Sequence, residues 1–194
     1  MRALARAAAY GAWRAEPRGR VPEFPDVSTA DARDLVQAAL LAGPAGADGP
    51  GWLGSEQAAA LLRCYGLPLA DLPPAGTELT VRVTDDHMFG SLVTLCPLGS
   101  GPGAARLTPL TDRDAGKLTA AVGLPGLSGH GAQAVHAPLI DLLLRVGRLA
   151  DELPEVTELE LSPVVAGPDG VAVVNARVRV SPYQPQDPFL RRLR

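Results

Sequence analysis

Several oxygen-bearing side chains occur near the end of the chain, on a segment from Pro154 to Val180 that is predicted to form a β-hairpin. Side chains alternate between the two sides of a strand, so Glu158, Glu160 and Ser162 are expected on one side of the first strand. Asn175 lies on the second strand. Such oxygens can ligate a hard cation such as Mg²⁺, although only a carboxylate contributes charge. These residues are either part of a metal site or the solvated face of an edge hairpin.

The hairpin itself is predicted from alternating apolar residues near positions 156–165 and 171–180. The turn Gly167-Pro168-Asp169-Gly170 joins them, and its Pro and Gly suit turn dihedral angles. Alternation places Asn175 on the side of Val173 and Arg177, and it places Val174, Ala176 and Val178 on the other side.

Two further residues could face a phosphate. A guanidinium pairs phosphate oxygens bidentately, which makes Arg106 a candidate together with Asp86. Equally, Arg106 could be an ion-pair partner at the start of a strand and Asp86 a turn residue. The GSGPG segment at 99–103 lacks the GxxxxGK[ST] pattern and is expected to be a linker. The three histidines fit no HExxH or nucleophile motif, and we expect them at the surface or at caps: His87, His130 and His136.

Composition excludes several classes of protein. The net charge of −3 across 194 residues argues against a nucleic-acid-binding surface, which is usually basic. No apolar run approaches the roughly 20 residues that span a bilayer, and the Arg-bearing start lacks the apolar centre of a signal peptide. Cys64 and Cys96 stand apart from each other and are expected to be free thiols. We expect a cytoplasmic protein that binds neither nucleic acid nor membrane.

The surrounding elements are predicted from periodicity. Helices are expected over 1–16, over 29–41 and from Ser55 to Tyr65, where Gly66 ends the helix. Ser28 or Thr29 would cap the second helix and Ser55 the third. The predicted buried positions of these two helices are Leu35, Ala38, Ala39 and Leu41, and then Ala58, Leu61, Leu62 and Tyr65.

Later in the chain, Leu79, Val81 and Val83 alternate as in a half-buried strand, and a short helix is expected to begin at Thr111 or Asp112. A longer helix is expected over 137–149, with Leu139, Leu142, Leu143, Val146 and Leu149 on one face. The predicted organisation is a helical arm and connector at 1–50, a domain at 51–180 and a tail at 181–194.

Several sequence blocks, which follow one another in the same order as in the family, resemble the ATP-grasp domain of NDP-forming acyl-CoA synthetases, including their fusions with a lysine acetyltransferase. The segment GTELTVRVTDDHMFGSLV is similar to the family's G-x-E-L-x-V-G-V-x-x-D-x-x-F-G-P-L-V, and RLTPLTDRDA is similar to R-L-x-P-L-T-D-x-D-A. ELELSPV and VNAR correspond to E-L-D-L-N-P-V and V-D-A-R, with Ser162 in place of Asn and Asn175 in place of Asp.

The resemblance implies an α+β fold, the larger ATP-grasp lobe, in which helices pack on a mainly antiparallel sheet. It implies ATP and Mg²⁺ as ligands. Glu160, Ser162 and Asn175 would correspond to the metal positions, and the nucleotide-facing candidates are Glu78, Asp86 and Arg106.

One region departs from the family. Only positions 69–75 separate Pro68 from Gly76, where the family has most of its smaller, nucleotide-clamping lobe. Three accounts of function stay open: a non-catalytic binding or regulatory module with a protein partner, an ATP-binding subunit of an acyl-CoA ligase or acetyltransferase completed by another chain, and a truncated remnant.

Overall fold

The computed structural model describes most of the chain from position 19 to position 183. The described positions are 6, 10, 11, 14, 17, 19–43, 45–46, 49–70, 72, 75–86, 89–99, 103–122 and 130–183. Most of the predicted helix over 1–16, His87 and nearly all of the predicted tail lie outside them. None of the helices in these ranges is long and apolar enough to cross a bilayer.

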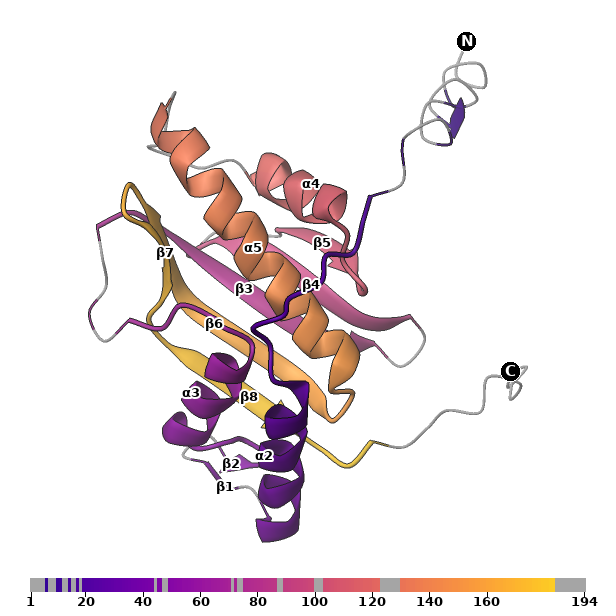
Figure 1. Ribbon diagram of the computed structural model, residues 1–194, viewed down its shortest axis with the longest axis vertical. Helices are drawn as coiled ribbons and strands as arrows, with labels where there is room; N and C mark the ends of the chain where they lie inside the picture. Colours follow the sequence, from indigo (N-terminus) through magenta and orange to yellow (C-terminus); the bar gives the residue numbers. More distant parts are fainter. Residues whose placement is uncertain are drawn as a thin grey trace.

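A six-stranded antiparallel sheet forms the centre of the molecule (Figure 1). Its order is β5-β4-β3-β6-β7, and β8 lies beside β6 on the same edge as β7. The strands are β3 (Thr77–Asp86), β4 (Gly90–Pro97), β5 (Ala104–Leu107), β6 (Val156–Gly167), β7 (Gly170–Val173) and β8 (Ala176–Val180). The predicted hairpin is confirmed, but its second strand is divided at positions 174–175.

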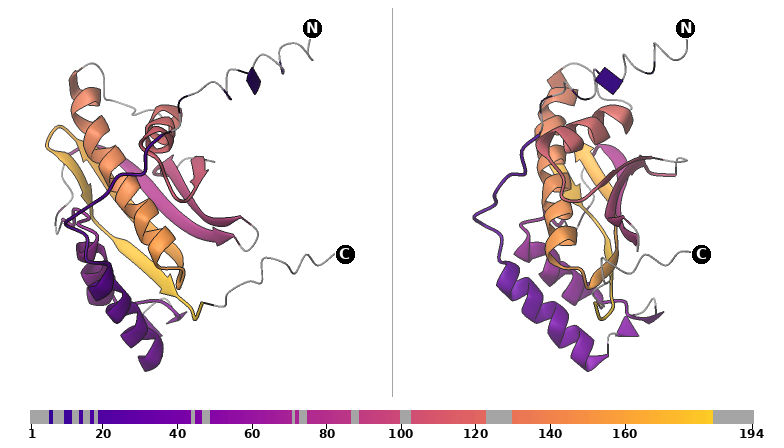
Figure 2. Two further views of the ribbon diagram at one scale, coloured as in Figure 1. Left: turned by 45° about the vertical axis from the view of Figure 1, so that its right-hand side comes forward. Right: turned by 90° about the vertical axis from the view of Figure 1, so that its right-hand side faces the viewer.

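Two helices, α4 (Asp112–Val122) and α5 (His130–Glu152), pack on one face of this sheet, and the other face carries no described helix (Figure 2). The predicted alternation of Leu79, Val81 and Val83 is confirmed, because all three are buried. The predicted apolar face of α5 is also buried: Leu139, Leu142, Leu143, Val146 and Leu149. The helix begins at His130, seven residues before the predicted start. The α+β architecture of helices on an antiparallel sheet is therefore observed.

A helical pair, α2 (Thr29–Ala42) and α3 (Ser55–Cys64), lies at the β8 edge of the sheet. The predicted buried stripe of α2 was wrong at Leu35, Ala38 and Leu41, and Leu41 is 89% exposed. The buried residues are Ala32, Val36 and Ala39, which are spaced four and three apart and so share a helix face. Which face packs depends on where α3 lies, and helix periodicity alone does not fix that.

The helix ends of this pair differ in part from expectation. Ser28 occupies the N-cap position of α2, but its hydroxyl donates to the Asp31 carboxylate instead of capping the backbone. The N-cap of α3 is Gly54, not Ser55, and the Gly54 N–H donates to the side chain of Gln57 at 3.1 Å. Gly66 follows α3 with φ of 64°, as its predicted place beyond the helix end requires. Two-residue strands β1 (Ala45–Gly46) and β2 (Gly49–Pro50) pair with each other between α2 and α3, within the predicted arm and connector.

The short connector between α3 and β3 runs along the open side of β7. The Val173 N–H donates to the Pro68 carbonyl at 2.7 Å, and the Ala70 N–H donates to the Val173 carbonyl at 2.9 Å. Leu69 forms an isolated parallel bridge with Val173. The sheet edge is therefore covered at the place where the family pattern has its smaller lobe.

Candidate functional site

The hairpin residues singled out in the sequence lie at an irregularity in the centre of the sheet. Between Leu79 and Val81 the pairing of β3 with β6 shifts register, which is a β-bulge. Thr80 lies at the bulge and is buried, and its hydroxyl and that of Ser162 share a hydrogen bond at 3.0 Å. Pro163 follows and has no N–H to donate to the sheet. Ser162 is thus held by β3 as well as by its own hairpin.

Asn175 lies next to Ser162 across the hairpin. The Ser162 N–H donates to the Asn175 carbonyl at 3.0 Å, and the Val174 N–H donates to the Pro163 carbonyl at 3.0 Å. The structure therefore brings the Ser162 and Asn175 backbones together. The predicted alternation through Asn175 was wrong, because Val173 is buried whereas Asn175 is exposed. Residues 174 and 175, between β7 and β8, have no regular strand conformation. The side chains that face the core therefore change from odd-numbered positions before this break to even-numbered positions after it.

Glu160 is paired with Arg82, a partner that local sequence patterns do not reveal. Its Cα is opposite that of Arg82 on β3, and the Arg82 Nε donates to the Glu160 carboxylate at 3.1 Å. A second ion pair lies two residues earlier on β6, where Arg179 of β8 donates to the Glu158 carboxylate at 2.7 Å. The sequence could have indicated Arg82, since it alternates with Val81 and Val83, but its pairing with Glu160 required the register of the two strands.

An aromatic ring completes this polar row at the β8 edge. The guanidinium of Arg177 lies 4.6 Å from the centroid of the Trp52 ring, and that of Arg179 lies 5.9 Å from it. Arg177 is paired with Glu160 in the register of β6 with β8. The face opposite the helices therefore carries a row of cations and anions across three strands, which we name the polar sheet face: Trp52, Arg82, Glu158, Glu160, Arg177 and Arg179.

The predicted nucleotide-facing residues are not brought together. Glu78 and Asp86 lie eight residues apart on β3, roughly 26 Å at about 3.3 Å per residue. Asp86 accepts a hydrogen bond from the Phe89 N–H at 3.0 Å, as a turn residue does. Arg106 lies on the edge strand β5, where its guanidinium is 3.9 Å from Asp114. These contacts agree with the structural roles left open for Asp86 and Arg106, and a nucleotide role for the three stays a prediction.

The donor set around Glu160 does not fit a stand-alone Mg²⁺ site. Mg²⁺ favours charged oxygen ligands in octahedral geometry. Here the single carboxylate is paired with Arg82, the Ser162 hydroxyl is bonded to Thr80, and the third position offers a neutral amide. Within the described ranges, no three His, Cys, Asp or Glu side chains gather closely enough to hold a metal. These three positions do not supply the ligands of such a site by themselves, and metal binding at Glu160, Ser162 and Asn175 stays an untested prediction.

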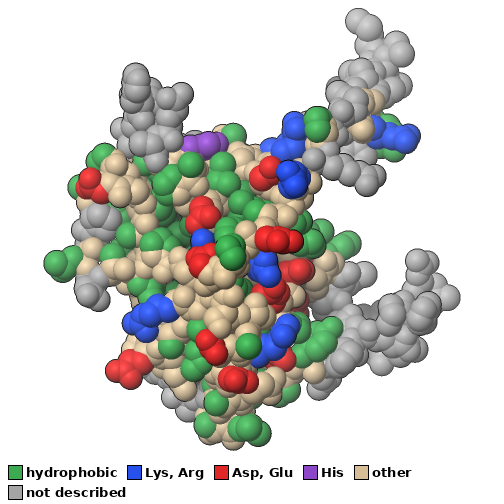
Figure 3. Space-filling model, in the orientation of Figure 1, with side chains coloured by type: hydrophobic (Ala, Val, Ile, Leu, Met, Phe, Trp, Pro, Cys, Tyr) green, Lys and Arg blue, Asp and Glu red, His purple; other side chains and the backbone are tan. Residues whose placement is uncertain are grey.

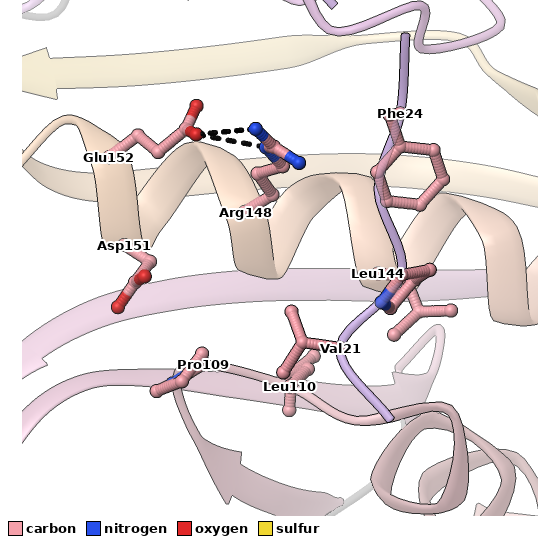
Figure 4. A pocket seen from close by; sticks show the side chains of 9 residues that line it. Val21, Phe24, Pro109, Leu110, Leu144, Arg148, Asp151 and Glu152 are labelled. Atoms are coloured by element: carbon pink, nitrogen blue, oxygen red, sulfur yellow. Dashed lines mark hydrogen bonds and ion pairs between the residues drawn. The ribbon is translucent and has the colours of Figure 1, made fainter. Parts of the chain in front are cut away.

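The opposite, helix-bearing face has a hollow of about 210 Å³ beneath the segment 19–26, which we name the strap (Figure 4). Basic and acidic side chains are interspersed among apolar ones on this side of the molecule (Figure 3). Asp151 points toward the side of Pro109, away from the Arg148–Glu152 pair. Partial burial and the charge of Glu152 raise the pKa of Asp151. The apolar lining comes from Val21, Pro22, Phe24, Pro109, Leu110 and Leu144.

Glu152 connects three elements beside this hollow. Its carboxylate accepts hydrogen bonds from Thr29 at 2.7 Å, Tyr65 at 3.1 Å and Arg148 at 2.9 Å. Burial by itself would raise the pKa of Glu152, but these hydrogen bonds and the Arg148 charge hold it below its usual value. Burial and the neighbouring Glu152 raise the pKa of the Tyr65 hydroxyl. These hydrogen bonds have a structural role, because they join α2, the end of α3 and α5 to one another.

Arg145 makes a comparable connection between the strap and α5. It donates to the Asp26 carboxylate at 2.7 Å and to the Tyr65 carbonyl at 2.9 Å, and it stacks 4.5 Å from the Phe24 ring centroid. Asp141 accepts from the same guanidinium at 2.8 Å. The strap is thereby fixed to the helical layer.

Comparison with known proteins agrees with this fold. The family model described as "ATP-grasp domain" matches residues 70–180. The chain is 31% identical over 123 residues to the acetate–CoA ligase [ADP-forming] I subunit beta of Pyrococcus furiosus, a match that covers 59% of this chain and 53% of the relative. It is 32% identical over 130 residues to acetate–CoA ligase [ADP-forming] I of Archaeoglobus fulgidus, covering 60% of this chain and 18% of the relative. The matches thus span about half of the first relative and a smaller part of the second.

Solved structures give the same result for the fold. PH1788 from Pyrococcus horikoshii superposes with a TM-score of 0.66 at 18% identity, over 80% of this chain and 100% of that chain. The dinucleotide-forming acetyl-coenzyme A synthetase 1 of Ca. Korarchaeum cryptofilum, solved with coenzyme A and Mg-AMPPCP, superposes with a TM-score of 0.61 at 21% identity, over 77% and 100%. On the family match over more than half of its length, the chain belongs to the ATP-grasp domain family.

Proposed function

We propose that this chain is a binding or regulatory module derived from an ATP-grasp domain, which does not turn over ATP by itself and works with a protein partner. One observation carries the proposal. The connector at 65–76 passes directly from α3 to β3 and is hydrogen-bonded to β7, so the polar sheet face has no second lobe opposite it among the described residues. A nucleotide on that face would be contacted from one side only.

The metal positions support the same proposal. A divalent ion and the phosphates it binds need charge from the protein, and loss of one carboxylate weakens such a site considerably. Ser162 and Asn175 are neutral, and Glu160 is already paired with a guanidinium. On this proposal ATP and Mg²⁺ bind weakly or not at all.

A surface suited to a partner lies beside the connector. A hollow of about 190 Å³ is formed between the connector and the β6–β7 turn, and Leu72 at its rim is 81% exposed. Exposed apolar groups next to a hollow are common at protein interfaces. This is the place where a separately encoded lobe would meet the sheet.

Calorimetric titration with ATP tests the proposal. The unsubstituted chain and the Ser162→Asn/Asn175→Asp variant are each titrated with and without Mg²⁺, and the variant supplies the family's residues. We expect no binding by the unsubstituted chain at micromolar concentrations. A micromolar dissociation constant, equivalent to roughly 8 kcal/mol, or ATP hydrolysis by the isolated chain would contradict the proposal.

The alternative function is the ATP-binding subunit of an ADP-forming acyl-CoA ligase or acetyltransferase, completed by a partner chain. The similarity to a β subunit of acetate–CoA ligase favours it. It requires that MgATP bind to the unsubstituted chain, alone or when the partner is added. The same titration, repeated with the partner chain present, separates the two functions: MgATP binding under either condition favours the ligase subunit, and no binding under both favours the non-catalytic module.

A further inference from the structure

Arg82 differs from the other charged residues of the polar sheet face in its contact with a predicted metal position. It is the residue directly opposite Glu160, the one carboxylate among the three predicted metal positions. Its side chain is 55% exposed and that of Glu160 is 31% exposed, so their contact at 3.1 Å forms on the surface of the sheet. The family pattern given above has glycine at this position, in V-G-V, where this chain has Val81-Arg82-Val83.

The charges around Glu160 show what a metal ion would meet there. On β8, the strand on the other side of β6 from Arg82, Arg177 is opposite Glu160. Two residues further along, Arg179 is ion-paired with Glu158. Glu160 is thus flanked across the sheet by a guanidinium-bearing residue on each side. A divalent cation that ligated Glu160 would have to displace Arg82 and would then lie beside its positive charge.

We infer that Arg82 is a resident cation that excludes divalent metal ions from Glu160. The inference rests on the proposed function, since it gives a cause for the loss of the metal. The Ser162→Asn/Asn175→Asp substitutions alone would then be insufficient to give a metal site. Removal of the Arg82 charge would be needed as well.

The test compares Mn²⁺ binding by variants of the full chain, with no nucleotide present. Mn²⁺ takes the oxygen ligands that Mg²⁺ takes, and free Mn²⁺ is counted by electron paramagnetic resonance. The background is Ser162→Asn/Asn175→Asp. We expect Arg82→Gln in this background to lower the dissociation constant at least tenfold, which corresponds to about 1.4 kcal/mol.

Three further variants in the same background make the result specific. Arg82→Lys keeps the charge and should bind Mn²⁺ as weakly as the background. Arg179→Gln removes the arginine that is ion-paired with Glu158 and should change the dissociation constant less than threefold. Adding Glu160→Gln to the Arg82→Gln variant should abolish the gain. Each ion-paired side chain to be substituted is partly or largely exposed, so each variant should fold, and circular dichroism is the measurement that checks this.

The inference is overturned if Arg82→Gln binds Mn²⁺ no better than the background, if Arg82→Lys binds as tightly as Arg82→Gln, or if Arg179→Gln has an equal effect. Its failure is distinguishable from failure of the proposed function. The proposed function is judged on the unsubstituted chain with ATP, whereas this inference is judged on variants with the metal alone.

Discussion

The two faces of the six-stranded sheet are built from alternate residues of the same strands, yet different interactions act on them. On one face Leu159, Leu161 and their neighbours are buried beneath α4 and α5. On the other, Glu158 and Glu160 form exposed ion pairs with arginines. Burial of apolar area is the larger contribution to folding, and exposed ion pairs contribute little. The helix-bearing face should therefore determine stability, which leaves the polar sheet face free to change its ligands.

The largest effect is expected from Leu161→Ala. Leu161 is fully buried in the central strand β6, so its truncation removes apolar contacts and leaves a cavity. The free energy of unfolding should fall by about 2–5 kcal/mol, measured by urea denaturation. Its sequence neighbour gives the control, since Glu160→Gln should change the same quantity by less than about 0.5 kcal/mol. Equal losses would show that the two faces do not differ in this way.

Gly76→Ala tests the connector that covers the β7 edge. A Cβ at Gly76 would clash with the Ala166 carbonyl, which is backbone and cannot move freely. We expect a loss of about 1–3 kcal/mol in the free energy of unfolding. Gly116→Ala provides a matched control. Gly116 lies within α4, and the nearest atom to its added Cβ would be Ile140 Cδ1 of α5, at an unstrained 4.0 Å. That change should stabilise the protein by about 0.5–1 kcal/mol through helix propensity.

Glu152→Gln sharpens the comparison within the helical layer, because this carboxylate is a polar group that contributes to the packing of α2, α3 and α5. We expect a loss of about 1–2 kcal/mol, since three hydrogen bonds to a charged acceptor become bonds to a neutral one. The folded pKa of Glu152 lies below its usual value of about 4.5. Its contribution is therefore present above pH 4.5 and is lost as the pH falls through the lower folded value.

Chemical denaturation at several pH values measures this effect. The difference in stability between the parent and Glu152→Gln should shrink as the pH falls below about 4.5. Glu155→Gln is the control, because Glu155 accepts a single exposed hydrogen bond from Gln37 at 3.2 Å. A pH-independent difference would mean that the Glu152 charge does not stabilise the helical layer.

The smallest effect on stability is expected from Arg82→Gln. The ion pair with Glu160 is exposed and screened by salt, so the free energy of unfolding should change by less than about 0.5 kcal/mol. Thermal melting at low and high salt measures the change. A loss above about 1 kcal/mol would indicate that the pair holds the sheet together and would remove the contrast between the two faces.

Elements with strong periodicity could be predicted from the sequence. The alternation at Leu79, Val81 and Val83 and the apolar face of α5 both correspond to buried side chains, because burial on one side imposes the period of the element. The stripe of α2 was wrong because apolar residues occur on more than one side of that helix. Its orientation depends on contacts with α3, which are distant from any local pattern.

The candidate site shows the same division. The hairpin and its polar residues were predicted locally, whereas the pairing of Arg82 with Glu160 joins residues 78 positions apart and depends on the register of β3 with β6. The bulge at Thr80 also arises from pairing between distant strands. The sequence of Asn175 and its neighbours suggested regular alternation, and the break appears only where that strand passes Ser162-Pro163.

Local residue patterns were enough to predict α3, the apolar face of α5, the alternation in β3, the closing hairpin and the short passage from α3 to β3. The neutral residues at positions 162 and 175 are read directly from the sequence. All of these depend on near neighbours and on residue chemistry. Tertiary contacts set which cation faces Glu160, which face of α2 is buried and how the connector covers β7. These features depend on contacts between segments far apart in the chain, and their geometry is fixed only when the strands pair and the helices pack on one face of the sheet.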